Sequence, residues 1–248
     1  VNSYGKDLEE HVDFADLLAE IAQLDGDFLI RFMTSHPRDA SEKLFDTMAK
    51  YDKIAKQLHL PFQSGSSRVL KAMNRHYDRE TYLKKVNYAK SVMPELVLTS
   101  DVIVGFPGET EEDFNELADF ITEAKFEHAG VFTYSREEGT PAYDFADQID
   151  EQIKQDRMDI LMRTQMNINT ARNESRIGSV ITVLCEAYDP VNECYYGRSS
   201  EDAPDIDGKV FFRYNGEERI APGSMVRVKV REVVDYDVYG FAMQPENA

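Results

Sequence analysis

Short apolar runs alternate with helix-like segments along the first part of the chain. Strand-like runs cover residues 28–33, 54–60, 96–104 and 128–135, and segments with apolar residues at helical spacing separate them. Such alternation is typical of a parallel sheet with right-handed crossovers. We therefore expect an α/β fold here, although four strands are too few for a complete eight-stranded barrel.

The pattern changes after a long helix that the spacing predicts over residues 150–176. Five short strands, separated by Pro, Gly and Asp turns, follow this helix. Short strands at this spacing predict a small antiparallel barrel. We therefore expect two domains, covering residues 1–176 and 177–248.

The charge balance and the absence of long apolar runs limit which partners, such as nucleic acids or membranes, the chain is expected to bind. The 248 residues include 46 Asp and Glu but only 28 Lys and Arg, for a net charge of −18. This excludes a generally basic nucleic-acid binder, although Arg227, Lys229 and Arg231 alternate with valines as one local basic row. No apolar run is long enough for a membrane span and no signal peptide is evident, so we expect a cytoplasmic protein without a membrane partner.

The two cysteines, Cys185 and Cys194, stand nine residues apart in strand-like stretches. They match no zinc or iron–sulfur spacing, so we expect ordinary reduced thiols and no metal site. The chain also begins at Val1 in a loop-like stretch, which suggests a fragment.

Two loops at strand ends are candidates for ligand binding. Residues 105–110 join a strand to a helix, and residues 61–66 follow another strand. Ligands of open α/β sheets bind outside the carboxyl ends of strands. Taken alone, each loop is better explained as a helix-capping turn. The acidic helix start at 109–113 would repel a phosphate, so a neutral or cationic ligand is the alternative there.

Particular strings carry a family resemblance over nearly the whole chain. They are residues 59–66 (HLPFQSGS), 71–75 (KAMNR), 101–114 (DVIVGFPGETEEDF), 134–135 (YS) and 139–141 (GTP). In this order and spacing they resemble the radical SAM methylthiotransferase family. The tail looks like a TRAM domain, the small β-barrel that closes these enzymes.

The resemblance implies a fold and a chemistry. The fold would be α/β, a partial, open parallel barrel of the radical SAM type followed by the TRAM barrel. Family enzymes use S-adenosyl-L-methionine and two 4Fe–4S clusters to transfer a methylthio group. The cluster-binding cysteines and the N-terminal domain are absent from this sequence. We therefore expect an inactive C-terminal fragment that binds no cluster and contains no catalytic residue of its own.

We expect S-adenosylmethionine to lie across the ends of three strands in the full-length enzyme. Ribose hydroxyls favour a carboxylate or amide, and adenine favours a flat apolar wall. The predicted cofactor-binding residues are Gln63, Ser64, Asp101, Gly105, Phe106 and Tyr134.

Two branches of the family differ in substrate. The MiaB-type branch modifies an isopentenylated adenosine beside the tRNA anticodon, and the RimO-type branch modifies the β-carbon of an aspartate in a basic small-subunit ribosomal protein (number twelve). Residues 35–39 and 63–66 look MiaB-like, whereas residues 129–145, 197–208 and 236–240 resemble the RimO type. We expect the RimO type, because an acidic barrel suits a basic protein better than tRNA, which remains the alternative.

The acidic loops of the barrel are the expected contact surface for the ribosomal protein. From residue 178 onward, 13 acidic and 7 basic residues give a net charge of −6. Five acidic residues in turn-like segments, where barrels commonly place binding loops, are the predicted substrate-binding residues: Asp202, Asp205, Asp207, Asp235 and Asp237. A non-catalytic binding module for a basic protein or RNA is a further alternative.

Overall fold

The computed structural model describes all residues except 10, 27, 34, 205–207, 217 and 244–248. The chain divides into two compact units, Val1–Ile168 and Asn169–Ala248. The predicted fold class is confirmed, since a parallel α/β unit is followed by a closed β-barrel. No helix among the described residues is both long enough and apolar enough to cross a membrane.

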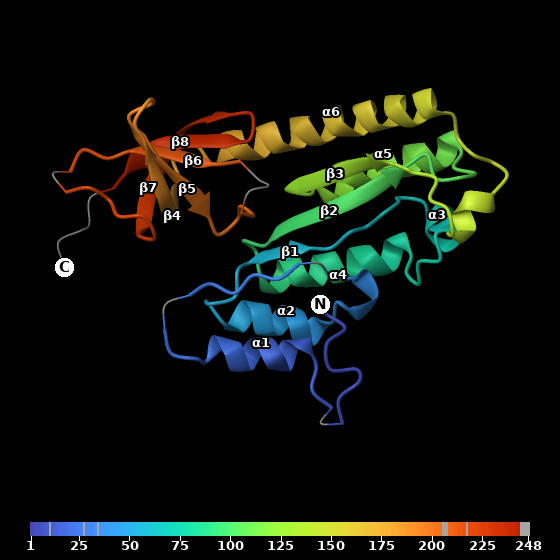
Figure 1. Cartoon of the computed structure of the whole chain (residues 1–248), viewed down its shortest axis with the longest axis horizontal. Helices are drawn as coiled ribbons and strands as arrows, with labels where there is room; N and C mark the ends of the chain where they lie inside the picture. The colour runs from blue at the N-terminus through green and yellow to red at the C-terminus, as the bar shows by residue number, and fades with distance from the viewer. Residues whose placement is uncertain (10, 27, 34, 205–207, 217, 244–248) are drawn as a thin grey trace. The chain divides into compact units, whose positions relative to one another are not determined.

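The first unit is built on a parallel three-stranded sheet in the order β1-β2-β3 (Figure 1). On one side of this sheet, helix α2 packs against both α1 and α4 (Figure 1). The strands of this unit are β1 Gln57–His59, β2 Val97–Val104 and β3 His128–Thr133. The helices are α1 Phe14–Ala22, η1 Pro37–Asp39, α2 Glu42–Lys50, α3 Ser67–Ala72, α4 Arg79–Val92, α5 Glu111–Ala124, η2 Pro141–Asp144 and the start of α6 Glu151–Ser175.

The strand expected over residues 28–33 is reduced to one parallel bridge between Ile30 and Ile54. The Ile30 N–H donates to the Lys53 carbonyl, and the Ile30 carbonyl accepts from the Ala55 N–H. The described residues of 28–33 form no ladder beyond this rung, so the predicted strand is wrong apart from Ile30. The sheet that the strands build is correspondingly narrower than predicted.

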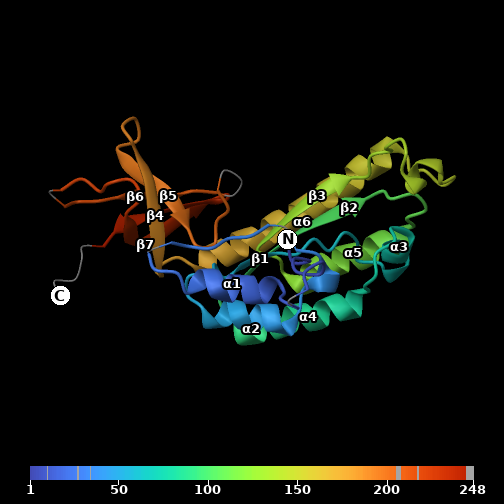
Figure 2. The same ribbon diagram turned by 60° about the horizontal axis from the view of Figure 1, so that its bottom comes forward.

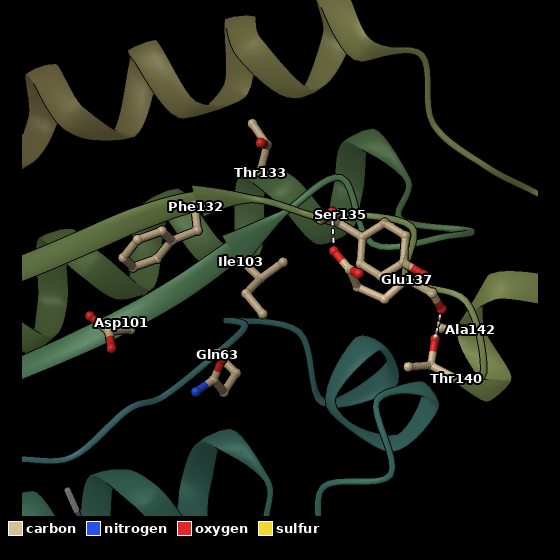
Figure 3. A pocket seen from close by; sticks show the side chains of 10 residues that line it. Gln63, Asp101, Ile103, Phe132, Thr133, Ser135, Glu137, Thr140 and Ala142 are labelled. Atoms are coloured by element: carbon tan, nitrogen blue, oxygen red, sulfur yellow. Dashed lines mark hydrogen bonds between the residues drawn. The ribbon is translucent and has the colours of Figure 1, made fainter.

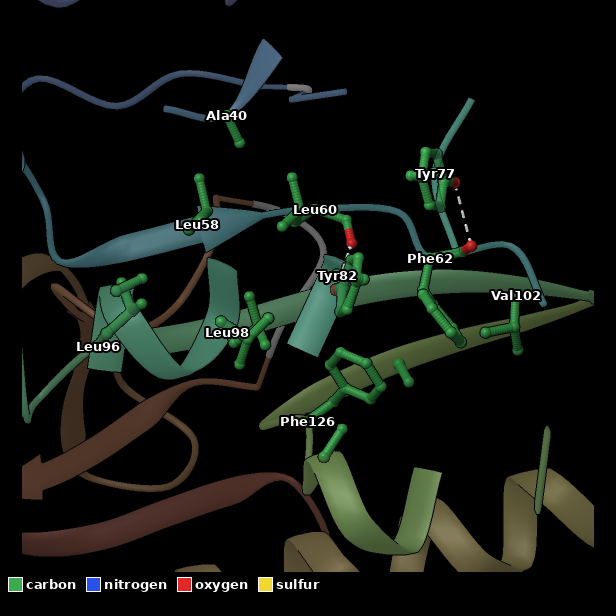
Figure 4. Packing of buried hydrophobic residues seen from close by; sticks show 14 of the residues in the cluster. Ala40, Leu58, Leu60, Phe62, Tyr77, Tyr82, Leu96, Leu98, Val102 and Phe126 are labelled. Carbon is green, nitrogen blue, oxygen red and sulfur yellow. Dashed lines mark hydrogen bonds between the residues drawn. The ribbon is translucent and has the colours of Figure 1, made fainter. Parts of the chain in front are cut away.

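The core of the first unit lies on one face of this sheet. Alternate residues of the strands, including Leu58, Leu98 and Val102, are fully buried there (Figure 4). The Tyr82 hydroxyl donates to the Leu60 carbonyl at 2.8 Å, which satisfies its polar atom inside the apolar layer (Figure 4). Burial raises the pKa of the Tyr77 phenol nearby to about 12, although the charge of Arg75 acts in the opposite direction. This face is therefore packed shut, and only the opposite face of the sheet can receive a ligand.

The loop after β1 is fastened to the start of α5. Thr110 and Asp113 form the predicted capping box of α5. The Asp113 carboxylate also accepts hydrogen bonds from the Ser66 hydroxyl, at 2.6 Å, and from the Arg68 guanidinium. These bonds fix residues 63–66 close to the end of β2.

The second unit is a closed five-stranded barrel in the order β4-β5-β6-β8-β7 (Figure 2). Its strands are β4 Val180–Asp189, β5 Cys194–Ser199, β6 Val210–Arg213, β7 Met225–Val234 and β8 Asp237–Ala242. The prediction of a purely antiparallel barrel is wrong in one place, because β6 and β8 pair in parallel. The chain passes from β6 to β7, which pairs with β4. The β7–β8 hairpin then places β8 between β6 and β7.

Inward-facing residues of the barrel form a separate apolar core. Val183, Val210, Phe212 and Val228 are almost fully buried there. Both cysteines are free and buried in this unit, and burial raises the pKa of each thiol. Among the described residues, no group of three or more His, Cys, Asp or Glu is arranged to hold a metal ion.

Candidate functional site

The face of the sheet opposite the core carries a polar row. Strand side chains alternate in direction, so residues two apart share a face. The parallel register pairs His59 with Thr99 and Asp101 with Gly130. These residues therefore lie side by side on the open face, where Asp101 is only half-buried.

A chain of polar contacts orients the Asp101 carboxylate. His59 Nε2 lies 3.2 Å from Asp101 Oδ2, and His59 Nδ1 lies 2.8 Å from Thr99 Oγ1. On the other side, a Cβ at Gly130 would lie 2.8 Å from Asp101 Oδ1. The absence of a side chain at Gly130 thus lets the carboxylate lie directly over the β3 backbone.

A cavity of about 570 Å³ opens at the carboxyl ends of the strands (Figure 3). Figure 3 shows Gln63 across from Asp101 and Ile103 of β2, with Phe132 on the neighbouring strand β3. The residues that line it are Gln63, Asp101, Ile103, Phe132, Thr133, Tyr134, Ser135, Glu137, Thr140 and Ala142. Three of the six predicted cofactor-binding residues, Gln63, Asp101 and Tyr134, therefore face one space.

Gln63 is placed in this wall by its backbone. Its N–H donates to the Asp101 carbonyl at 2.9 Å, and its carbonyl accepts from the Ile103 N–H at 2.8 Å. Its φ of 74° lies in the left-handed region, which is uncommon for a residue with a side chain. The loop after β1 thus pairs again with β2 and holds the Gln63 amide beside Asp101.

The other three predicted residues do not line the cavity. Ser64 is 1% exposed, and its hydroxyl accepts from the Ser66 N–H at 3.3 Å. The Phe106 ring is buried edge-on against Tyr134, with centroids 5.3 Å apart. The Gly105 N–H donates to Glu109 Oε1 at 2.9 Å. These residues support the wall from behind, and a role for them in cofactor binding stays a prediction.

A buried ion pair holds the loop after β2. Arg157 Nη1 of α6 donates to Glu109 Oε1 at 2.7 Å, and both side chains are almost fully buried. Burial raises the pKa of the Glu109 carboxyl, while the Gly105 N–H and the Arg157 charge act in the opposite direction. Nearby, Lys154 Nζ of α6 donates to the Tyr134 carbonyl at 3.1 Å. Helix α6 therefore fixes both segments that end the sheet.

Sequence reasoning missed several residues of this site. His59 was named only within a family string, and Phe132, Lys154 and Arg157 were not singled out. Phe132 is 55% exposed on a strand whose other residues are buried or partly buried, and a bulky apolar side chain in that position indicates an open face. This exposure is visible only in the structure. The partner of each charged residue likewise depends on contacts between distant segments.

The acidic residues expected on the barrel loops have different environments. Asp202 is 8% exposed and accepts from the Ser199 N–H at 2.9 Å, so it closes a turn, and burial raises its pKa. This contradicts the expectation that Asp202 faces a partner. Asp237 accepts from the Lys209 N–H at 2.8 Å, and Asp235 is exposed in a left-handed turn with φ of 53°. The other two predicted residues, Asp205 and Asp207, lie outside the described residues.

Family models match both units. Residues 2–121 match the radical SAM superfamily, and residues 177–243 match the TRAM domain. A solved structure of the coproporphyrinogen III oxidase HemN from Escherichia coli, a radical SAM enzyme, superposes with a TM-score of 0.46 at 17% identity, over 67% of this chain and 45% of that chain.

Curated relatives align along the whole chain. The tRNA-2-methylthio-N(6)-dimethylallyladenosine synthase of Alkaliphilus oremlandii (strain OhILAs) is 43% identical over 98% of this chain and 50% of its own length. The enzyme of the same name from Clostridium botulinum (strain Loch Maree / Type A3) is 41% identical over 97% of this chain and 52% of its own length. That from Clostridium tetani (strain Massachusetts / E88) is 40% identical over 97% of this chain and 51% of its own length. The chain spans about half the length of these relatives.

The sheet with its open polar face and the barrel thus define a radical SAM unit followed by a TRAM domain, as the sequence motifs predicted. Together with the alignments across both units, this supports membership of the radical SAM methylthiotransferase family. Closeness to the RimO-type branch is not supported, because the aligned relatives carry the name of a tRNA-modifying enzyme.

Proposed function

We propose that the chain is part of a radical SAM methylthiotransferase that modifies an adenosine of tRNA. The observation that carries the proposal is the alignment, at 40–43% identity, of both units with tRNA-2-methylthio-N(6)-dimethylallyladenosine synthases. The ribosomal-protein reading that the acidic charge favoured fits these relatives less well than the tRNA alternative. Net charge is a property of the whole surface and does not exclude a local site for RNA.

The cavity at the strand ends fits S-adenosylmethionine. The Asp101 carboxylate and the Gln63 amide offer partners for ribose hydroxyls or an ammonium group, and the exposed ring of Phe132 offers an apolar wall. The hydroxyl of Tyr134 is buried without a hydrogen-bond partner, as expected where a polar ligand supplies one. When bound, this cofactor supplies the family's radical and methyl chemistry. The residues named here bind and orient it.

The residues of this chain do not fit a 4Fe–4S cluster. Such clusters are held by cysteine thiolates, typically four of them. The chain has two cysteines, and both lie buried in the barrel unit. We therefore derive no step through a cluster from this chain, and the expectation that it binds none stays a prediction.

The outer face of the barrel is suited to RNA. The rings of Phe211 and Tyr239 stack with centroids 5.2 Å apart, and Tyr196 adjoins Phe211 at 6.2 Å. Lys209 Nζ lies 4.6 Å from the centre of the Tyr196 ring, and the exposed Lys229 is paired in register with Phe241 on β8. Interleaved aromatic and basic side chains bind stacked bases and phosphates. Lys209 and Lys229 add positive charge to this aromatic face, which also carries Glu232, paired in register with Tyr239.

Binding to two candidate substrates tests the proposal. Fluorescence anisotropy would compare a tRNA transcript with the basic small-subunit ribosomal protein, each titrated with the whole chain at low and moderate salt. We expect binding of tRNA that weakens as salt rises, because phosphate contacts release counterions. Lys229→Glu should weaken it, whereas Lys84→Glu, an exposed lysine of α4, should have little effect. Binding of the protein without binding of tRNA would restore the RimO-type reading.

A further inference from the structure

A second cavity, of about 580 Å³, opens at one end of the barrel. It belongs wholly to the second unit and shares no residue with the cavity at the sheet. Strands β4 and β6 run towards this end, β5 begins there, and the segment before β7 crosses it. Two stretches that are distant in the sequence, the β4–β5 connection and the segment from the end of β6 towards β7, therefore build one concave surface.

Tyrosine rings form part of its wall. Tyr188 is 47% exposed, and its ring meets Tyr195 edge-on with centroids 5.0 Å apart. Tyr195 is held in place, because its ring stacks on Phe212 inside the barrel and its hydroxyl accepts from the Ile220 N–H at 3.3 Å. A rigid ring thus supports an exposed one, and exposed tyrosine offers a flat surface at little entropic cost.

A third ring is positioned by a glycine. A Cβ at Gly216 would lie 2.2 Å from the Tyr214 hydroxyl and ring, so the ring packs directly over the glycine backbone. Tyr214 also lines the cavity, and the Asn215 side chain beside it offers both an amide donor and an acceptor. Ring surfaces and an adaptable amide are thereby placed around the same opening.

Two arginines give this cavity a charge opposite to that of its unit. Arg213 and Arg219 both line it, and neither forms an ion pair with another residue that the structure describes. Glu193 is the described acidic residue of the lining. Two guanidinium groups on the wall of one cavity, in a unit of net charge −6, favour a ligand that carries phosphate.

We propose that this cavity binds a single unpaired nucleotide of the RNA, with the base against Tyr188 and Tyr214 and the phosphate at Arg213 and Arg219. The inference rests on the proposed function, since it assigns a subsite for the same RNA. Sequence-tolerant RNA binding commonly combines aromatic stacking with cationic contacts to the backbone. The Asn215 amide would meet the polar edge of the base.

The test uses the whole chain and two labelled RNAs, a hairpin with an unpaired loop and a blunt duplex with the same stem. Tyr188→Leu should weaken binding of the hairpin about tenfold and leave binding of the duplex unchanged, because only an unpaired base can stack. Arg213→Gln should weaken binding and reduce the salt dependence by about one counterion. The matched controls are Tyr236→Leu, at a tyrosine that is 42% exposed in the same unit, and Arg198→Gln. Neither control residue lines the cavity.

The outcomes separate this inference from the proposed function. If the chain binds the hairpin but Tyr188→Leu behaves like Tyr236→Leu, the nucleotide pocket is refuted while RNA binding stands. If the chain binds neither RNA, the pocket and the proposed substrate fail together. Adenosine monophosphate should displace the hairpin more effectively than inorganic phosphate does. Equal displacement would show an anion site and overturn the assignment of the base.

Discussion

Removal of the Arg157 guanidinium tests how strongly α6 holds the loop after β2. Arg157 and Glu109 are 6% and 4% exposed, and their charged atoms lie 2.7 Å apart. Arg157→Met retains an unbranched side chain but leaves the Glu109 carboxylate buried without its cation. The Gly105 N–H would then be the main remaining hydrogen-bond donor to that carboxylate.

The expected loss is large compared with the stability of a domain. Breaking a buried ion pair by removing one partner costs about 3–5 kcal/mol. Native domains are stable by about 5–15 kcal/mol. For a unit of this size, each kcal/mol lowers the melting temperature by about 2–4 °C, so Arg157→Met should lower it by roughly 6–20 °C.

The loss should also depend on pH. Burial already raises the pKa of Glu109, and removal of Arg157 removes one of the influences that oppose the rise. The folded variant therefore binds a proton more tightly than the unfolded chain does. Its stability is greatest below the unfolded pKa, near 4.3, and falls as pH rises through the raised folded pKa. The deficit should thus be smaller at pH 5 than at pH 8.

Thermal unfolding followed by circular dichroism at both pH values measures these effects. Arg163→Met, at an exposed position of the same helix, is the matched control and should change stability by no more than about 0.5 kcal/mol. Adding Glu109→Gln to Arg157→Met should recover much of the loss, because it removes the unpaired charge. If Arg157→Met melts like Arg163→Met, or if its deficit is equal at both pH values, the pair does not hold the loop.

Four further outcomes are expected. Asp101→Asn should weaken the binding of S-adenosylmethionine to the chain about tenfold or more in calorimetric titration, because a charged hydrogen bond contributes about 1.5–3 kcal/mol, whereas the exposed Asp25→Asn should not. Gly130→Ala should weaken the same binding, since its Cβ would meet the Asp101 carboxylate at 2.8 Å, and unchanged affinity would show that this carboxylate is not at the ligand. Burial would raise the pKa of Asp113, but hydrogen bonds led by that from Arg68 hold it well below the usual range. Asp113→Asn should therefore cost about 1–3 kcal/mol in urea unfolding at pH 7, and the difference from the unmodified chain should shrink as pH falls below about 4. After anaerobic reconstitution and gel filtration, the chain should retain no stoichiometric iron, and retained iron would contradict the prediction drawn from its two cysteines.

Elements defined by local pattern were predicted well. The run at 96–104 became β2 at Val97–Val104, and the helix over 150–176 became α6 at Glu151–Ser175. The run at 28–33 shows where this reasoning fails, because apolar residues favour extended chain but do not determine how many neighbours it pairs with. The parallel pairing of β6 and β8 depends in the same way on the order of strands around the barrel.

The sequence predicted those residues of the candidate site that lie at the carboxyl ends of strands, but not the contacts between them. The rule that ligands lie at carboxyl ends placed Gln63, Asp101 and Tyr134 around one cavity. The contact of His59 with Asp101 depends on the cross-strand register, which the sequence does not determine. Asp202 was misread as a binding residue, although its spacing from Ser199 matches a turn that closes on its own side chain.

The barrel and the sheet of the first unit differ in whether they have unpaired edge strands. The barrel closes on itself, so its strands leave no open ladder to another molecule. The sheet of the first unit instead has two edge strands, β1 and β3, each of which pairs with β2 on one side only, and β3 is the longer of the two. An edge strand can template pairing with a second chain, and exposed Phe132 lies on β3. Self-association of the chain during expression would therefore start at β3, and a lysine at Phe132 is the substitution best placed to suppress it.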